Sequence, residues 1–262
     1  MFLSNLTKKN KKFKNILKGK DLYIVGNGAS LKYYDLKVLK NKNVMTSNAL
    51  FFHKDFKYLS SIFYVIGHPG IFFSYWKHQY LKRFTKNLLG LNYKEKMSKF
   101  KDKNITYFTP LINSLSALPF NMNYLHSKSN KNLSYDASNN FNFNTGSLSY
   151  MLGLAAYMKP NKIYLISVDY TMNPELIGHF FENFEIVGKK YSGWSSKYIT
   201  KVMEKIPIYQ VIPNDNFTAS CGMTPVFYEK LFGKKIRKKE HYEIISFEDI
   251  EKMKKWNFPY HF

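Results

Sequence analysis

Apolar runs of strand length alternate with segments of helical length from Leu22 onward. The apolar runs predict strands over 22–25, 43–47, 61–66, 105–109, 162–167 and 207–212. Helices are predicted over 30–40, 70–89, 148–158, 196–205, 225–232 and 247–255. Strands and helices that alternate at this spacing predict an α/β fold with a Rossmann-like, doubly wound and mostly parallel sheet.

The remaining segments lack this alternation. Residues 1–20 form a basic amphipathic leader and 214–262 a helical, basic C-terminal segment, and each is expected either to lie on a membrane surface or to be a solvated tail. Between them, the Rossmann-like domain is expected over 21–213. Within it we expect polar, asparagine-rich loops over 113–143 and a flexible, aromatic-rich lid over about 171–194.

Positive charge is the main feature of the composition. The 262 residues include 40 Lys and Arg against 18 Asp and Glu, which gives a formal net charge of +22. Such a charge attracts nucleic acid, anionic lipid or a polyanionic substrate. Dense basic clusters at 8–20 and 234–239 suit a membrane surface better than a nucleic-acid groove, and no nucleic-acid-binding signature is present. We therefore expect an anionic membrane surface, and not nucleic acid, as a partner.

Cysteine content and hydropathy indicate a cytoplasmic protein. Cys221 is the single cysteine, so the sequence has no disulfide framework and no cysteine metal cluster. No window approaches the run of about 20 apolar residues that crosses a bilayer, and no apolar signal core follows the first lysines. We expect a cytoplasmic location, peripheral to the inner face of the membrane if the basic ends bind lipid. A homo-oligomer is also compatible with the sequence.

A strand that runs into a glycine turn is the first candidate ligand site. Its candidate contacts are Gly26, Asn27, Gly28 and Ser30. Glycine lets the main chain approach a ligand closely, and N–H groups at the start of the next helix would face a phosphate. A dinucleotide fingerprint would have a glycine in place of Leu31 and an acidic residue in place of Asn48, and no Walker lysine is present. The turn predicts another kind of nucleotide site, with an ordinary strand-to-helix turn as the alternative.

A second turn, helix and strand follow in the middle of the chain. Thr145, Gly146 and Ser147 form a capping turn before the helix. The strand after this helix ends at Asp169 and Tyr170, at the carboxyl edge where open α/β sheets bind ligands. All five residues are candidate ligand contacts. Asp169 is expected to orient a loop or a ligand hydroxyl, or to cap the turn that follows.

The segments 24–31, 63–73 and 145–170 resemble, in this order, the bacterial sialyltransferases of glycosyltransferase family 42. The resemblance to motility-accessory factors and the related domain of unknown function 115 is looser. The resemblance to the sialyltransferases implies the sialyltransferase variant of the GT-A fold, with the nucleotide sugar bound by residues 21–213. It further implies that Asn27 and Asn48 bind the CMP of the donor. It also implies an inverting transfer of sialic acid or a related nonulosonic acid from a CMP-sugar to a cell-surface glycan or glycolipid, as in lipopolysaccharide or capsule biosynthesis.

The sequence offers three histidines as the catalytic base. The family's histidine lies in a Tyr-x-Gly-His context, where this chain has Trp194. His179 follows the carboxyl edge of the sheet between apolar residues and is the preferred base, since an imidazole accepts protons near neutral pH. His68 beside a Pro-Gly turn is second, and His241 resembles a C-terminal histidine motif of animal sialyltransferases. The other histidines, His53, His78, His126 and His261, are expected at the surface.

The sequence has no Asp-x-Asp pair, the usual metal-binding element of transferases that use nucleotide diphosphates. We therefore expect a metal-independent reaction without a cofactor. Helix N-terminal amides, the hydroxyls of Ser147 or Tyr170 and a lysine would stabilise the leaving phosphate. Two alternatives stay open. One is pyrophosphoryl transfer of the pterin pyrophosphokinase type, which needs magnesium held by carboxylates, and the other is a non-catalytic basic protein that binds nucleotides or membranes.

Overall fold

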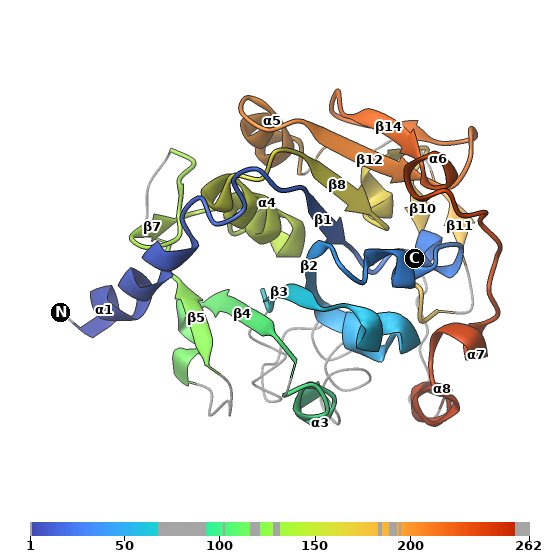
Figure 1. Ribbon diagram of the computed structural model, residues 1–262, viewed down its shortest axis with the longest axis horizontal. Coiled ribbons are helices and arrows are strands. Elements are labelled where there is room, and N and C mark those ends of the chain that lie inside the picture. Colours follow the sequence, from blue (N-terminus) through green and yellow to red (C-terminus); the bar gives the residue numbers. More distant parts are fainter. Residues whose placement is uncertain are drawn as a thin grey trace.

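An eight-stranded parallel sheet forms the centre of the protein (Figure 1). The computed structural model describes residues 2–67, 93–101, 103–115, 121–127, 132–182, 185–188, 193 and 195–254. The strand order is β14-β12-β8-β1-β2-β3-β4-β5, and every neighbouring pair is parallel. From β1 the chain adds β2 to β5 on one side, then returns to add β8, β12 and β14 on the other. The sheet is therefore doubly wound, as predicted, and its order reverses between β1 and β8.

Six of the eight strands lie where the hydrophobic pattern predicts them. They are β1 (Leu22–Val25), β2 (Asn43–Ser47), β3 (Ser61–Val65), β4 (Ile105–Pro110), β8 (Ile163–Ile166) and β12 (Ile208–Ile212). The pattern misses the two edge strands, β5 (Met122–Leu125) and β14 (Thr224–Phe227). We predicted a loop at β5 and helix at part of β14. Edge strands contact a single neighbour. β14 is largely exposed and β5 includes the polar Asn123, so neither carries a continuous apolar pattern.

Helices cover both faces of the sheet because successive strand residues point to opposite faces. Leu22 and Ile24 pack in the core under α4 (Gly146–Met158) and α5 (Ser196–Met203), whereas Tyr23 and Val25 pack on the other face. That other face is covered by η2 (Ala29–Lys32), η3 (Leu36–Leu39), η4 (Asn48–Phe52), η5 (Lys54–Tyr58), α3 (Tyr93–Ser98), α6 (Tyr228–Phe232), α7 (His241–Ile244) and α8 (Phe247–Lys254).

The helix predicted over 30–40 is wrong in detail. Two short 3-10 helices, η2 and η3, occupy this stretch. Asp35 separates them with an extended backbone, and its carboxylate accepts a hydrogen bond from the N–H of Lys37 to start the second one. The helix predicted over 70–89 lies outside the described residues.

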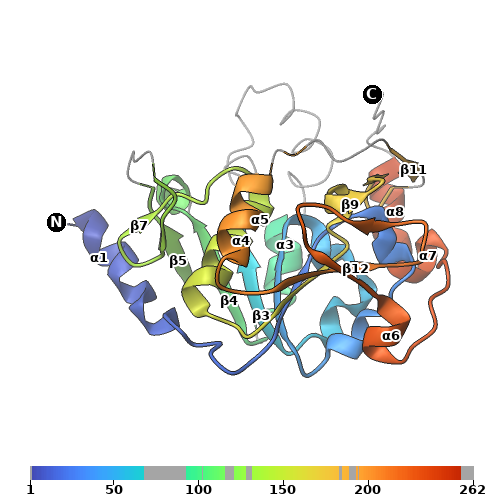
Figure 2. The same ribbon diagram turned by 90° about the horizontal axis from the view of Figure 1, so that it is seen from above.

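The N-terminal segment packs on the sheet. α1 (Phe2–Lys8) and η1 (Lys9–Phe13) lie beside β5 (Figure 2). The Asn10 side chain is fully buried and donates to the carbonyls of Tyr124 and Ala137, each at 2.8 Å. Phe13 and Leu17 are buried in the core. These apolar residues of the expected membrane-facing leader therefore contact the protein itself.

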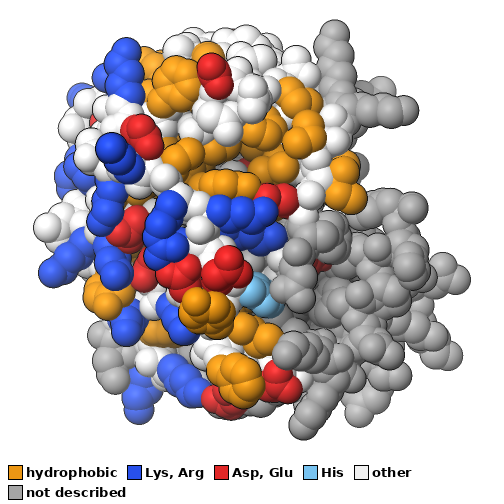
Figure 3. Space-filling model, turned by 90° about the vertical axis from the view of Figure 1, so that its right-hand side faces the viewer, with side chains coloured by type: hydrophobic (Ala, Val, Ile, Leu, Met, Phe, Trp, Pro, Cys, Tyr) orange, Lys and Arg blue, Asp and Glu red, His pale blue; other side chains and the backbone are white. Residues whose placement is uncertain are grey.

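The C-terminal basic run at 234–239 pairs with acidic side chains of the protein. The ion pairs are Lys234 with Asp35, Arg237 with Glu243, Lys238 with Glu185 and Lys239 with Asp55. Basic and acidic side chains are interspersed on this side of the molecule (Figure 3). Four of the five basic side chains of the run are thus neutralised locally. Among the described helices, none is long and apolar enough to cross a membrane.

Candidate functional site

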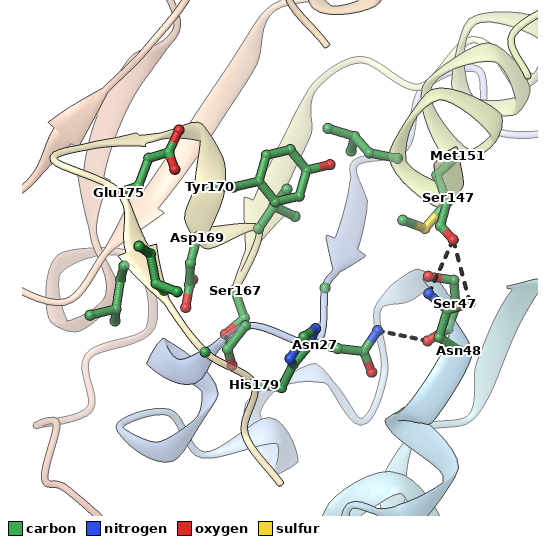
Figure 4. A pocket seen from close by; sticks show the side chains of 17 residues that line it. Asn27, Ser47, Asn48, Ser147, Met151, Ser167, Asp169, Tyr170, Glu175 and His179 are labelled. Atoms are coloured by element: carbon green, nitrogen blue, oxygen red, sulfur yellow. Dashed lines mark hydrogen bonds between the residues drawn. The ribbon is translucent and has the colours of Figure 1, made fainter. Parts of the chain in front are cut away.

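A cavity of about 380 Å³ opens at the carboxyl edge of the sheet, beside the reversal in strand order. It is lined by the loop after β1, the end of β2, the first turns of α4, residues 167–170 after β8, and residues 175–179. Their side chains surround one space in Figure 4. Open α/β sheets bind ligands at this position, and cavities of about 300–1,000 Å³ are typical of small-molecule sites.

Most of the predicted site residues lie around this cavity. Those that line it are Gly26, Asn27, Gly28, Asn48, Ser147, Asp169, Tyr170 and His179. Ser30, Thr145, Gly146 and His241 are not among the described lining residues. His68 and Trp194 lie outside the described residues.

Gly26 and Gly28 serve contacts within the protein. A Cβ on Gly26 would lie 2.9 Å from the carbonyl carbon of Ser167, and one on Gly28 would lie 2.8 Å from the Ser167 carbonyl oxygen. Gly28 has a φ of −69°, which any residue can adopt. The glycines therefore let the loop after β1 pass close to the end of β8. Packing against β8 thus explains the two glycines, whereas the sequence analysis explained them by the close approach of a ligand.

Asp169 ties the glycine loop to β8. Its two carboxylate oxygens accept hydrogen bonds from the backbone N–H and the hydroxyl of Ser30, both at 2.6 Å. The Ser30 hydroxyl also lies 2.7 Å from that of Ser167. Burial raises the pKa of Asp169 to about 7, although the hydrogen bonds from Ser30 oppose this shift. The backbone N–H of Ser30 donates to Asp169, so the prediction that this N–H contacts a phosphate is wrong.

Two asparagines present amide groups at the cavity. The Asn48 side chain donates to the hydroxyl of Ser147 at 3.1 Å, and Asn48 has a left-handed backbone with a φ of 55°. The Asn27 amide donates to the Ser47 carbonyl at 2.9 Å, while its buried Oδ1 accepts no hydrogen bond from the described residues. A buried acceptor without a partner is costly in the absence of water or a ligand donor. Asn27 lines the cavity, and rotation of its side chain would bring this acceptor to a bound molecule.

The N-terminus of α4 faces the same cavity. Ser147 and Leu148 of its first turn are lining residues. Thr145 precedes the helix but does not cap it, because its hydroxyl is bonded to that of Tyr198 at 2.5 Å. The positive end of a 13-residue helix therefore points its first amides toward the cavity. None of the described lining residues is a lysine or an arginine, so this helix end is the main local source of positive potential among them.

His179 is positioned by backbone pairing with the glycine loop. His179 and Gly28 form an antiparallel bridge, and the N–H of Phe180 donates to the Asn27 carbonyl at 3.1 Å. Figure 4 shows the imidazole beside Asn27 at the edge of the cavity. The described part of the expected lid is thus attached to the loop here. In the expected lid, the short strand β9 (Met172–Asn173) pairs with β13 (Thr218–Ala219). The strand β10 (Leu176–Ile177) pairs with β11 (Ile186–Val187).

Glu182 orients the imidazole of His179. One carboxylate oxygen accepts from the backbone N–H of His179 at 2.7 Å and lies 3.1 Å from its Nδ1. The Glu182 side chain is only 6% exposed, whereas that of His179 is 38% exposed. A carboxylate on Nδ1 favours the tautomer with a proton there and leaves Nε2 as the proton acceptor. This is the geometry of a general base with an orienting acid.

The sequence interpretation missed Glu182, although its i,i+3 spacing from His179 was a usable signal. Two other histidines also differ from expectation. His53, expected at the surface, is 2% exposed, and burial lowers its pKa to about 3. His241 lies outside the cavity lining, and its Nε2 donates to the carbonyl of Phe181 at 2.8 Å. His241 therefore has no described contact with the proposed ligand space.

Comparison with known proteins returned solved structures only. No protein-family model and no curated protein matches the chain. The chain is similar to the sialyltransferase CstII from Campylobacter jejuni in complex with the substrate analogue CMP-3FNeuAc, with 20% identity, coverage of 90% of this chain and 99% of that chain, and a TM-score of 0.45. A complex of CST-II with trisaccharide acceptor and CMP has the same values.

A third similar structure is the monofunctional alpha-2,3-sialyltransferase Cst-I from Campylobacter jejuni. It has 18% identity, covers 73% of this chain and 75% of that chain, and has a TM-score of 0.39. All three structures are sialyltransferases, the class that the sequence motifs resemble.

Proposed function

We propose that this protein is a metal-independent, inverting glycosyltransferase that moves sialic acid or a related nonulosonic acid from a CMP-sugar to a glycan acceptor. The observation that carries the proposal is the convergence of five segments on one cavity. The glycine loop, Asn48 and the N-terminus of α4 lie around the same space as a histidine that a buried carboxylate orients. These are the parts that nucleotide binding, leaving-group stabilisation and proton removal require.

The nucleotide would be held by neutral groups. The Asn27 Oδ1, which is buried without a described partner, would accept from a ribose hydroxyl or from the amino group of a cytosine once its side chain turns toward the cavity. Asn48 and Ser147 already bond to each other and would present their remaining donors and acceptors to the same ligand. Neutral amides bind a nucleotide without repelling its phosphate. CMP is named for one of the similar sialyltransferase structures and CMP-3FNeuAc for another, so CMP is the first nucleotide to test.

The leaving phosphate would lie at the N-terminus of α4. The bond between the sugar and the CMP phosphate breaks during transfer, and its electrons leave with the phosphate. Amides and the dipole of a helix N-terminus stabilise the negative charge that develops. The Ser147 hydroxyl, in the first turn of α4, is a further donor at this position.

His179 would act as the general base. Its Nε2 removes the proton from the acceptor hydroxyl, and the acceptor oxygen then forms a bond to the sugar carbon as the bond to CMP breaks. A single displacement of this kind inverts the configuration at that carbon. Glu182 stabilises the imidazolium that forms, because its carboxylate lies 3.1 Å from Nδ1.

The cavity is less suited to pyrophosphoryl transfer, which needs magnesium bound by carboxylates. Two acidic side chains, Asp169 and Glu175, line the cavity. Both oxygens of Asp169 accept hydrogen bonds from Ser30, and the group is buried. No group of three metal-ligating side chains occurs among the described residues. Glycosyl transfer without a metal therefore fits this donor set better.

Equilibrium titration with nucleotides tests the proposal. CMP should bind in the presence of a chelator, and more tightly than AMP, GMP or UMP. Asn48→Ala should weaken CMP binding about tenfold, because it removes an amide at the cavity and the partner of Ser147. Asn43→Ala is the matched control, since the Asn43 side chain bonds to the Asp21 carbonyl at the opposite end of the strands. A strict need for ATP and magnesium, with no binding of CMP, would reject the proposal.

A further inference from the structure

We infer that His241 is a positioning residue for His179, which it holds through the backbone and the ring of Phe181. The inference rests on the proposed role of His179 as the base. It assigns to His241 a contribution to the reaction without contact with the substrate.

A hydrogen bond joins the ring of His241 to the residue that stacks on the base. The Nε2 of His241 lies 2.8 Å from the Phe181 carbonyl oxygen. A carbonyl oxygen only accepts, so the imidazole is the donor. The ring of Phe181 in turn stacks on the imidazole of His179, with centroids 4.9 Å apart and an interplanar angle of 12°. Since Phe181 is 4% exposed, its position limits where the His179 ring can lie.

The neighbours of His241 contact Glu185, which follows Glu182, and the 3-10 helix η2. We call residues 234–245 the C-terminal strap. Lys238 of the strap donates to the carboxylate of Glu185, and the N–H of Lys239 donates to the Lys32 carbonyl at 2.9 Å. Burial opposes ionisation of Glu185, but hydrogen bonds from Lys238 and from Tyr33 outweigh this effect and lower its pKa. We call residues 178–182 the base segment. The strap contacts this segment at Phe181 and contacts Glu185 beyond it.

The strap itself is firmly attached to the domain. Ile244 and Ile245 are fully buried in the core on the second face of the sheet. Glu240 and Glu243 form a capping box that starts α7, so His241 lies at a fixed helix start. In Figure 2, β11 and α7 lie at the same end of the molecule, which agrees with the contacts above.

Such an attachment matters because the base segment has little regular structure of its own. It is held to the glycine loop by the Gly28–His179 bridge and by the Phe180 N–H. A displacement of about 1 Å in a catalytic group reduces a rate about 100-fold. Loss of the bond to the Phe181 carbonyl would free one side of this segment.

Two variants of His241 separate the hydrogen bond from the ring. Gln places an amide N–H close to the position of the histidine Nε2, whereas Leu fills similar space without a donor. With CMP-N-acetylneuraminate as donor and water as acceptor, His241→Leu should lower kcat about 10- to 100-fold and change KM less than twofold. His241→Gln should recover most of kcat. His126→Leu is the control, because no described contact joins His126 to the cavity or the base segment.

An equal kcat for His241→Leu and His126→Leu would overturn the inference, and so would a KM rise that accounts for the whole loss. Urea unfolding of each variant identifies one that fails to fold. In that case Lys238→Ala, with Lys235→Ala as its control in the same basic run, repeats the comparison at a surface position. Equal kcat values for these two lysine variants would likewise contradict the role of the strap.

Hydrogen exchange separates this inference from the proposed function. The amide of Phe180 donates to Asn27, so its exchange reports the position of the base segment without any substrate. His241→Leu should accelerate exchange in a peptide covering 176–182, and His126→Leu should not. Unchanged exchange would overturn the role of His241. Accelerated exchange in a protein that turns over no CMP-sugar would support the positioning contact and reject the proposed function instead.

Discussion

Substitution of Gly26 tests why the loop after β1 needs glycine. In the structure, a Cβ on Gly26 would meet three backbone atoms. It would lie 2.9 Å from the Ser167 carbonyl carbon, 3.2 Å from the Val168 Cα, and closer still to the Ser167 oxygen. Backbone atoms cannot rotate away as a side chain can. Gly26→Ala therefore forces the loop and the end of β8 apart.

The size of this effect follows from the distances. The Ser167 carbonyl carbon is about 0.5 Å short of the 3.4 Å at which ordinary contact begins, and the oxygen falls short by more. Overpacking of this kind costs about 1–3 kcal/mol in the free energy of unfolding. Gly67→Ala is the matched control after β3. Its Cβ would lie 3.3 Å from Cδ2 of Tyr150, so we expect a loss below about 1 kcal/mol.

Urea unfolding of the protein without nucleotide, followed by titration with CMP, measures both consequences. We expect Gly26→Ala to unfold at lower urea with an unchanged m-value, and to bind CMP about tenfold more weakly because Asn27 moves with the loop. A glycine needed for close packing and a glycine needed to admit a ligand give different results in this experiment. If Gly26→Ala unfolds at the same urea concentration as the parent and loses only CMP binding, the glycine admits a ligand, and our explanation from packing is refuted.

Three further substitutions test other parts of the site. Glu182→Gln keeps the size of the side chain but removes the charge beside the Nδ1 of His179. The kcat for CMP-sugar hydrolysis should therefore fall about 10- to 100-fold, with the CMP affinity unchanged. A kcat equal to that of the parent would exclude an orienting role for Glu182. Asp169→Asn tests the pKa of about 7. Between pH 4 and 7 the folded parent binds a proton at Asp169 that the unfolded chain has lost. The free energy of unfolding of the parent should therefore decrease as the pH rises, by at most about 1.4 kcal/mol per pH unit. Urea midpoints of the variant should not show this decrease. Gly153→Ala places a Cβ 2.6 Å from the Phe143 Cβ and the Phe141 ring, so the thermal midpoint should drop by several degrees; an unchanged midpoint would contradict the close packing of α4.

The central strands and α4 were predictable because their signals are local. The apolar runs at β1 and β8 and the turn before Gly146 are each complete within a few residues. The edge strands were not predictable in this way, since β14 exposes most of its residues. The 3-10 helices after β1 also escaped prediction, because the extended backbone of Asp35 before the second helix is not encoded in the apolar pattern.

The residues around the cavity were largely predictable, but their partners were not. Asn27, Asn48 and Ser147 follow strands or begin a helix, so their place at the carboxyl edge follows from the topology. The contact between Ser30 and Asp169 joins positions 139 residues apart, and it changes the role of both. Likewise, the bond from His241 to Phe181 depends on how the C-terminal strap crosses the domain. Such contacts arise from the packing of distant segments, which no local pattern specifies.

The most direct test of the account is the rate of CMP release from CMP-N-acetylneuraminate, in chelator, by the parent protein and by His179→Gln. We predict that the parent releases CMP well above the rate in buffer. His179→Gln should be about 100-fold slower or more while it binds CMP with a Kd within twofold of the parent. Equal rates for the two proteins, or no release by the parent, would contradict the claim that this cavity binds a CMP-sugar beside a histidine base.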